Sequence, residues 1–369
     1  MRMRILINIG HPAHVHLFKN MIINLRKKGH MIKIVTRDKD VTLKLLDAYG
    51  FDYEVISGYY QTMFGKMYDF IKTDLKLFKI AIKTKPDILI AVGDPYVAHV
   101  GKLIKRPSIV FTDTEHAKLA NELTFPFVTV ICTPSTFKQN LGKKQIIYNG
   151  YHELAYLHPN YFKPDPIVLD YLGLSENDKF IIIRLISWKS AHDAYSRGFS
   201  QDLKRIIRSL EEYGHVLITS ERKLDSLLEK YKMRIPPEKL HSALYYASLY
   251  FGEGGTTAVE AALLGTPSVH VEAFKTKSGE VVDATKIHGN FDELANKYGM
   301  LYTFVDQNQA LNKALEILQD ENAKKEMRRK REKLLREKID VTAFMTDFIE
   351  NYPESFHMYQ RRKKDFDHV

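Results

Sequence analysis

Residues 5–25 read ILINIGHPAHVHLFKNMIINL, and this stretch decides the fold class. Residues 5–9 form a strongly apolar run, as in a parallel strand that is buried on both faces. After the loop that begins at Gly10, apolar residues recur at helical spacing as far as Leu25, and Gly29 ends the predicted helix. The stretch therefore predicts a strand, a loop and a helix, which is the repeating unit of an α/β fold.

The same alternation of strand and helix patterns continues to about residue 148. Residues 68–83 form a long amphipathic pattern that predicts a helix. Apolar runs predict further strands at residues 31–36, 53–56, 88–92, 108–111, 128–132 and 145–148. A βαβα succession forms a mostly parallel, doubly wound sheet, in which we expect the usual strand order 3-2-1-4-5.

The rhythm breaks after Tyr148. Asn149 and Gly150 form a turn, and prolines punctuate the following stretch up to Pro166. A second series of strands is then predicted at residues 180–185, 215–219, 249–252 and 268–271, followed by helices at 310–318, 323–335 and 342–351. The chain is too long for one ordinary hydrophobic core. We therefore predict an α/β protein of two doubly wound domains, with a boundary between residues 149 and 166.

Composition excludes several other classes of protein. The chain has 369 residues, of which 44% are hydrophobic and 27% charged, as is typical of a globular protein. Its single cysteine, Cys132, cannot form an internal disulfide, which fits a reducing cytoplasm. There is no run of eighteen apolar residues, and the first residues lead directly into a strand. We therefore expect a cytoplasmic protein without a signal peptide or membrane span.

The formal net charge is +10, and the basic side chains are spread over helical segments such as residues 72–83 and 324–338. No nucleic-acid-binding signature accompanies them, so we interpret most of them as solvated helix faces and expect no nucleic-acid partner. The basic helices and the tail at residues 361–364 leave open a peripheral contact with the inner, anionic face of a membrane.

Histidines gather in the loop after the first strand. Ligands of doubly wound sheets bind beyond the carboxyl ends of the strands, and this loop holds His11, His14 and His16. A histidine in this position can act as a general base because its ordinary pKa lies near neutrality. The alternative is that these side chains only cap or pack the loop.

Carboxylates follow the next two strands of the same predicted edge. Asp94 follows residues 88–92 and would face the histidine loop, where it could orient an imidazole. It could equally cap the helix that starts near Tyr96. Glu115 lies in the loop after residues 108–111. We take His11, His14, Asp94 and Glu115 as the candidate catalytic residues.

Residues 252–260 read GEGGTTAVE and form the most informative loop. Glycines let the backbone approach an anion closely, and the free amides at a helix N-terminus bind phosphate groups. Glu260 could accept hydrogen bonds from both hydroxyls of a ribose. The downstream residues 265–267, GTP, make the string more specific than a glycine pair alone. The candidate diphosphate-binding residues are Gly254, Gly255, Thr256 and Thr257.

Arg184 ends the strand at residues 180–185 and could neutralise a diphosphate without a metal ion, although a surface arginine would look the same. Ser187 and Trp188 follow it. Trp188, the only tryptophan, could stack on a base or a sugar, or it could pack in the core. These three residues complete the candidate nucleotide-sugar site.

In these motifs the chain resembles the GT-B superfamily. This superfamily contains many glycosyltransferases and the non-hydrolysing UDP-N-acetylglucosamine 2-epimerases, and the likeness is greatest to an uncharacterised family of predicted glycosyltransferases. It rests on Gly10–His14 with Gly29–His30, on residues 149–153, NGYHE, and on residues 254–267. The resemblance spans nearly the whole chain and implies two Rossmann-like domains that face a central cleft.

The resemblance also implies roles for the parts of the chain. Residues 1–155 would bind the acceptor and carry the base, and residues 156–350 would bind a nucleoside-diphosphate sugar, with a UDP-sugar as the first candidate. Residues 351–369 would form a helix that returns to the first domain and a basic tail. Closure of the two domains would align the reactants.

Two chemistries compete within the superfamily. In inverting transferases a histidine after the first strand activates the acceptor, a place that His11 or His14 fills, with Asp94 as its partner. The epimerases keep acids after the fourth and fifth strands, but their His-Arg-Arg-Glu-Asn string is absent from residues 187–192. We therefore favour a metal-independent glycosyltransferase of cell-envelope or glycan synthesis. Its acceptor would be a hydroxyl group, and one hypothesis is that this hydroxyl belongs to a lipid-linked molecule. We expect the enzyme to need no cofactor. The alternatives are a 2-epimerase-like enzyme and a non-catalytic nucleotide-binding protein.

Overall fold

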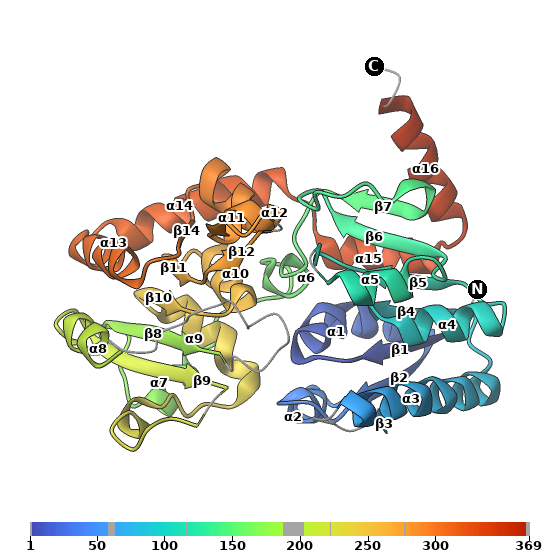
Figure 1. Ribbon diagram of the computed structural model, residues 1–369, viewed down its shortest axis with the longest axis horizontal. Helices are drawn as coiled ribbons and strands as arrows, with labels where there is room; N and C mark the ends of the chain where they lie inside the picture. The colour runs from blue at the N-terminus through green and yellow to red at the C-terminus, as the bar shows by residue number, and fades with distance from the viewer. Residues whose placement is uncertain are drawn as a thin grey trace. The chain divides into compact units, whose positions relative to one another are not determined.

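The chain divides into two compact units, which are described separately below (Figure 1). The computed structural model describes residues 2–57, 63–115, 117–186, 203–221, 223–276 and 278–366. The first unit comprises Met1–Tyr161 and Ile339–Val369, and the second comprises Phe162–Lys338. The chain therefore leaves the first unit once and returns to it.

The first unit is built on a seven-stranded sheet in the order β3-β2-β1-β4-β5-β6-β7. Every neighbouring pair in it is parallel. The predicted order of the first five strands is confirmed. The strands are β1 (Arg4–Ile9), β2 (Met31–Arg37), β3 (Tyr53–Ser57), β4 (Ile88–Val92), β5 (Ser108–Phe111), β6 (Val130–Pro134) and β7 (Gln145–Tyr148). Because all of them run in one direction, their carboxyl ends share one edge of the sheet.

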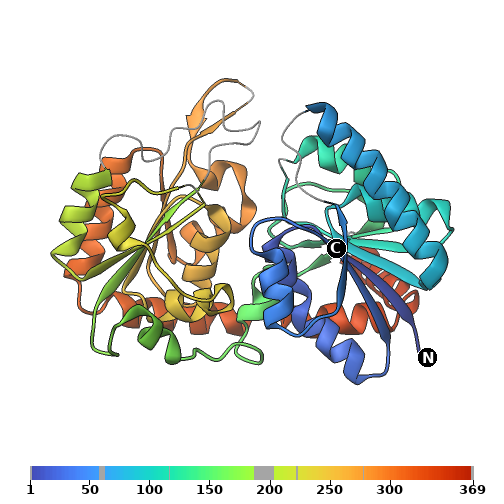
Figure 2. The ribbon, with the colours of Figure 1, turned by 90° about the horizontal axis from the view of Figure 1, so that it is seen from below.

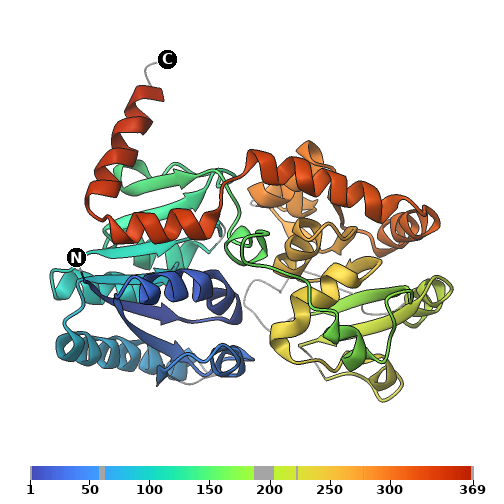
Figure 3. The same cartoon turned by 180° about the vertical axis from the view of Figure 1, so that it is seen from behind.

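Helices cover both faces of this sheet, as its apolar strands require. On one face α3 packs against α4, and α4 packs against α5; on the other, α1 packs against α15. Figure 1 shows the first group in front of the sheet, and Figure 3 shows α1 and α15 from behind. The helices are α1 (Pro12–Lys27), α2 (Thr42–Ala48), α3 (Met63–Thr84), α4 (Pro95–Leu103), α5 (Lys118–Thr124), α6 (Leu154–Leu157), α15 (Val341–Glu350) and α16 (Glu354–Phe366).

Helix α15 belongs to the first unit, whereas the sequence analysis placed residues up to 350 in the second domain. The hydroxyl of Thr342 donates to the carbonyl of Ala155 at 2.6 Å. Val341 packs so closely on Gly150 that a Cβ atom there would lie 2.6 Å from the valine methyl. The return of the chain therefore begins at residue 339, and the first crossing lies after Tyr161, within the predicted boundary of residues 149–166.

The second unit contains a five-stranded parallel sheet in the order β14-β11-β10-β8-β9. Its strands are β8 (Phe180–Leu185), β9 (His215–Ser220), β10 (Leu249–Gly252), β11 (Ser268–Val271) and β14 (Leu301–Phe304), and a small hairpin joins β12 (Phe274–Lys275) to β13 (Val281–Val282). Its helices are α7 (Ile167–Leu172), α8 (Leu203–Glu211), α9 (Leu240–Tyr246), α10 (Gly255–Leu263), α11 (Ala284–Ile287), α12 (Gly289–Asp292), α13 (Gln307–Gln319) and α14 (Ala323–Glu337). In each unit, helices flank the sheet on both sides (Figure 2). Strand β14 and the hairpin were not predicted.

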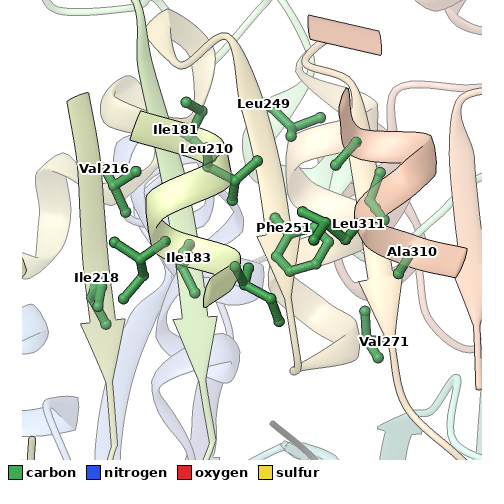
Figure 4. Close-up of a cluster of buried hydrophobic side chains, with 14 of the residues drawn as sticks. Ile181, Ile183, Leu210, Val216, Ile218, Leu249, Phe251, Val271, Ala310 and Leu311 are labelled. Carbon is green, nitrogen blue, oxygen red and sulfur yellow. The ribbon is translucent and has the colours of Figure 1, made fainter. Parts of the chain in front are cut away.

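A buried apolar cluster holds α8 and α13 on one face of the second sheet (Figure 4). Ile183 and Phe251 contribute from adjacent strands, and Leu210 and Leu311 contribute from the two helices. All four side chains are buried. The two α/β units together confirm the predicted fold class.

No helix among the described residues is both long enough and apolar enough to cross a membrane.

We expect Phe251→Ala to destabilise the second unit by about 3–5 kcal/mol, because it removes a large side chain from a closed apolar cluster. Urea unfolding followed by far-ultraviolet circular dichroism measures this loss. Tyr171→Ala is the matched control, since Tyr171 is exposed; it should change the stability by at most about 0.5 kcal/mol. Equal losses in the two variants would contradict the assigned core.

Candidate functional site

The histidines after β1 fold the loop into the first turn of α1. His11 is the N-cap of this helix, and its Nδ1 atom accepts a hydrogen bond from the backbone N–H of Ala13 at 3.2 Å. The Nδ1 atom of His14 accepts from the N–H of Gly10 at 3.3 Å. The two rings lie 5.7 Å apart. Both side chains therefore have a structural role, which was the alternative left open for them.

His14 is uncharged at neutral pH. Burial lowers its pKa well below the ordinary value, and the nearby His11 and His152 lower it further. Because Nδ1 accepts the hydrogen bond from Gly10, the ring proton resides on Nε2. His14 is therefore placed to donate a hydrogen bond rather than to accept a proton.

A second histidine of this edge, His152, is paired with a carboxylate. Its Nδ1 atom lies 3.3 Å from Oδ2 of Asp113, which follows β5, while His152 itself follows β7. Both residues share the carboxyl edge with His14 because their strands are parallel. The ring of His152 also stacks on that of Tyr148, with an interplanar angle of 10° and 6.4 Å between centroids. The carboxylate and the stacked ring together fix the orientation of the imidazole.

This pairing determines which nitrogen of His152 can act as a base. A carboxylate can only accept a hydrogen bond, so the proton of a neutral ring lies on Nδ1 and the lone pair on Nε2. Burial lowers the pKa of His152, and the charge of Asp113 partly opposes this. The Nε2 atom is buried and has no hydrogen-bond partner among the residues that the structure describes. An orphaned acceptor of this kind is suited to receive a proton from a substrate.

The two candidate acids hold the surrounding backbone. Asp94 is the N-cap of α4: Oδ1 accepts from the N–H of Val97 at 3.0 Å, and Oδ2 accepts from the side-chain amide of Asn8 at 2.9 Å. Burial raises the pKa of Asp94. Oε1 of Glu115 accepts from the N–H of Lys138 at 3.2 Å. Asp94 thus takes the capping role weighed in the sequence analysis, and its two oxygens bind an amide and a helix end rather than a histidine.

In the second unit the glycine string forms the sharp turn from β10 into α10. Gly252 has a φ of 151°, and a Cβ atom there would lie 2.4 Å from the carbonyl oxygen of Arg184 on β8. Gly254 has a φ of 91° and is the N-cap of α10. Because glycine has no side chain, it does not cap the first amides of the helix. Gly255 is half-buried and Thr256 is exposed, whereas Thr257 is buried. The turn thus presents the positive end of a helix whose amides can bind an anion.

Arg184 lies against this turn. A Cβ atom on Gly254 would lie 3.5 Å from the Nε atom of Arg184. Its terminal nitrogens donate to the hydroxyl of Thr219 at 3.1 Å and to the carboxylate of Glu221 at 2.6 Å. Its Nε atom is buried and unpartnered within the described part of the chain. The guanidinium is therefore held in one orientation beside the N-terminus of α10.

Glu260 lies one turn further along α10 and is buried. Its Oε1 atom is 3.0 Å from Nε2 of His241, which is also buried. This partner was not predicted from the sequence, because His241 lies on a different helix, α9. Ser187 and Trp188, the two remaining candidates, lie outside the described residues.

Within the described ranges, no three His, Cys, Asp or Glu side chains are grouped as a bound metal ion would require.

Comparisons with known proteins relate most of the chain to one protein family. A family model described as "Protein of unknown function (DUF354)" matches residues 3–353. The chain is 25% identical over 276 residues to an uncharacterized protein of Methanocaldococcus jannaschii, MJ0665, an alignment that covers 71% of this chain and 80% of the relative.

Two solved structures show what the fold resembles. Spinosyn forosaminyltransferase SpnP has a TM-score of 0.63 at 11% identity, and the match covers 97% of this chain and 100% of SpnP. The UDP-GlcNAc 2-epimerase of Methanocaldococcus jannaschii, solved with UDP-GlcNAc and UDP, has a TM-score of 0.60 at 14% identity, covering 88% of this chain and 98% of the epimerase. The fold is therefore that of GT-B proteins, as the sequence motifs implied.

The paired carboxylate predicts how the pKa of His152 responds to mutation. Asp113 raises this pKa against the effect of burial. We therefore expect His152 to titrate below the ordinary value of about 6.5, and to titrate still lower in Asp113→Asn. Proton NMR of the imidazole C–H signals measures both values. The exposed Asp320→Asn serves as a control that leaves the titration unchanged; a rise of the pKa in Asp113→Asn would contradict the pairing.

Proposed function

Because the chain belongs to the DUF354 family and has a GT-B fold, we propose that it is a glycosyltransferase that needs no metal ion. It moves a sugar from a nucleoside-diphosphate sugar, with a UDP-sugar as the first candidate, to a hydroxyl group. The observation that carries the proposal is the pair formed by the half-buried Asp113 and the buried His152, whose Nε2 atom makes no hydrogen bond to any of the described residues. Transfer to a hydroxyl needs such a base, and binding alone does not.

The second unit binds the donor in this proposal. The amides of Gly255 and Thr256 at the N-terminus of α10 face the diphosphate, and Gly254 keeps the turn clear of a side chain. Arg184, beside the same turn, supplies a positive charge as the diphosphate leaves. Glu260 takes the ribose hydroxyls, with His241 orienting its carboxylate.

The first unit binds the acceptor and supplies the base. Nε2 of His152 removes the proton from the acceptor hydroxyl while that oxygen bonds to the anomeric carbon of the sugar. The bond from the anomeric carbon to the diphosphate oxygen breaks, and the nucleoside diphosphate leaves with its electron pair. Asp113 stabilises the imidazolium that forms, and the proton then passes to solvent. His14, which carries its proton on Nε2, donates a hydrogen bond to the bound substrates.

A 2-epimerase-like activity is the second candidate. Three carboxylates, those of Asp94, Asp113 and Glu115, follow adjacent strands β4 and β5 of the first sheet. An epimerase needs acids at such positions for proton transfer at the sugar. Asp94 and Glu115 already accept hydrogen bonds from backbone or amide groups. They are therefore less suited to proton transfer, and the epimerase is the weaker candidate. Binding of nucleotides without turnover is the third candidate.

The donor site is tested by comparing Gly254→Ala with Gly173→Ala. Both glycines have a positive φ. A Cβ atom on Gly254 would crowd Ile186 and Arg184, whereas a Cβ atom on Gly173 would have no other atom within 4 Å. Both variants should lose stability because of the positive φ, Gly254→Ala more than Gly173→Ala because of the crowding, and only Gly254→Ala should weaken nucleotide-sugar binding, by about tenfold or more. Thermal-shift titrations with UDP-, GDP-, TDP- and CMP-sugars measure this. Equal affinities of the two variants for the nucleotide-sugar would show that the donor does not bind at this turn.

The base is tested by His152→Gln and Asp113→Asn, with the exposed His357→Gln as the control. We expect the first two to lower kcat by about 10²- to 10⁴-fold, with donor affinity unchanged, since a general base contributes that much. Release of nucleoside diphosphate is followed with the donor found in the binding screen, and NMR identifies the sugar product. Wild-type turnover in His152→Gln would exclude it as the base, and a C2 epimer among the products would replace transfer by epimerisation.

A further inference from the structure

Helix α3 of the first unit exposes a stripe of four large apolar side chains. Tyr68, Ile71, Leu75 and Ile82 are 62%, 57%, 56% and 53% exposed, respectively. Their spacing of three, four and seven residues places them on one face of the helix. The opposite face, with Leu77 and Ala81, is buried against the sheet. A soluble helix normally carries polar side chains on its outer face, so this stripe needs an explanation.

Lysines lie along one side of the stripe. Lys76, Lys79 and Lys83 are exposed, and Lys72 is half-buried with its Nζ atom 5.6 Å from the centre of the Tyr68 ring. The outer face of α3 is thus both apolar and positively charged.

The acids of this helix point inward. Asp69 is buried, and Oδ2 of Asp74 lies 3.1 Å from Nδ1 of His99 on α4. Over residues 68–84, where the side chains of α3 are described, no carboxylate lies on the outer face to neutralise the lysines. The field of this face therefore attracts anions.

The basic helix α14 of the second unit shows that charge alone does not produce such a surface. Its two buried side chains are Met327 and Leu334, which are apolar, and its exposed positions include Lys325 and Arg329. A solvated basic face therefore exists elsewhere in the chain without an exposed aliphatic stripe. Helix α3 differs in combining the two.

We propose that the outer face of α3, formed by Tyr68, Ile71, Leu75 and Ile82 with Lys72, Lys76, Lys79 and Lys83, docks on an anionic lipid bilayer. Large apolar side chains on one face, lysines along one of its borders and no acid on that face are the features of a helix that lies in the plane of the headgroups. The lysines meet the anionic headgroups while the apolar side chains enter the boundary of the acyl chains. At 22 residues, α3 is about 33 Å long and offers an extended contact.

The position of α3 relates this surface to the candidate site of the same unit. Helix α3 follows β3 and runs back to β4, so its N-terminal end lies at the carboxyl edge of the sheet. His14 and Asp113 follow β1 and β5 at that edge. A docked α3 would therefore bring the edge to the membrane interface. The acceptor would then be a lipid-linked hydroxyl. This identification of the acceptor rests on the proposed function, whereas the docking of α3 does not.

Co-sedimentation of the full chain with vesicles tests the docking. Vesicles of phosphatidylcholine alone are compared with vesicles that also contain phosphatidylglycerol, at low and at high salt. We expect wild-type protein to pellet with the anionic vesicles and to be released by salt. The triple change Ile71→Ser, Leu75→Ser and Ile82→Ser should lower the partition coefficient by about 100-fold, because three exposed aliphatic side chains no longer enter the interface.

Matched variants separate this face from general charge and general hydrophobicity. Lys76→Glu with Lys79→Glu should abolish the preference for anionic vesicles, whereas Lys325→Glu with Arg329→Glu on α14 should preserve it. Leu227→Ser, at a leucine of the second unit that is 61% exposed, should also leave binding intact. Circular dichroism checks that each variant is folded.

Failure of wild-type protein to pellet, or equal losses in the α3 and α14 variants, would overturn the proposal. So would a concentration-dependent dimer that the three serines dissolve, since the stripe would then join two copies of the chain. Donor binding by Gly254→Ala and turnover by His152→Gln do not enter this experiment. The proposed function and the docking surface can therefore fail separately.

Discussion

The pairing of the buried His152 with Asp113 is the interaction on which the candidate site of the first unit depends. An imidazole removed from water loses its hydration, and a partner that accepts a hydrogen bond from it offsets this cost. Here the two residues, 39 positions apart in the sequence, meet because β5 and β7 lie in one parallel sheet and end at one edge. The stacked ring of Tyr148 then leaves the imidazole one orientation. The pairing converts an ordinary side chain into an oriented acceptor.

The second unit depends on a related constraint, the close approach of two backbones. Gly252 packs on the carbonyl of Arg184, so β10 and β8 meet without a side chain between them at the point where both strands end. The turn that follows directs the N-terminus of α10 and the guanidinium of Arg184 to the same place. Each unit therefore presents its polar groups beyond the carboxyl ends of a parallel sheet, where doubly wound proteins bind ligands. The first offers an acceptor of protons, and the second offers donors for anions.

Much of this fold could be predicted from the sequence, because buried parallel strands are apolar runs and their helices have a strong period. Where the prediction was incomplete, the signal was short or non-local. Strand β14 is a four-residue run, LYTF, with two partly exposed aromatic side chains. Helix α15 follows α14 after a break of three residues, and only its packing against Gly150 and Ala155 assigns it to the first unit.

The candidate site was predicted in position more than in detail. The loops of His14 and Gly254 could be located because they follow strands. The partners of individual side chains could not be predicted. His152 contacts Asp113, and Glu260 contacts His241, only because the fold brings distant parts of the chain together. Asp94 was ambiguous in sequence because a helix cap and a catalytic acid use the same residue. The most direct test of the account is the tautomer of His152, measured by long-range ¹H–¹⁵N NMR on protein with ¹⁵N-labelled histidine. Above the pKa of His152 we expect a proton on Nδ1 and none on Nε2; a proton on Nε2 would leave the site without its base and contradict the proposed mechanism.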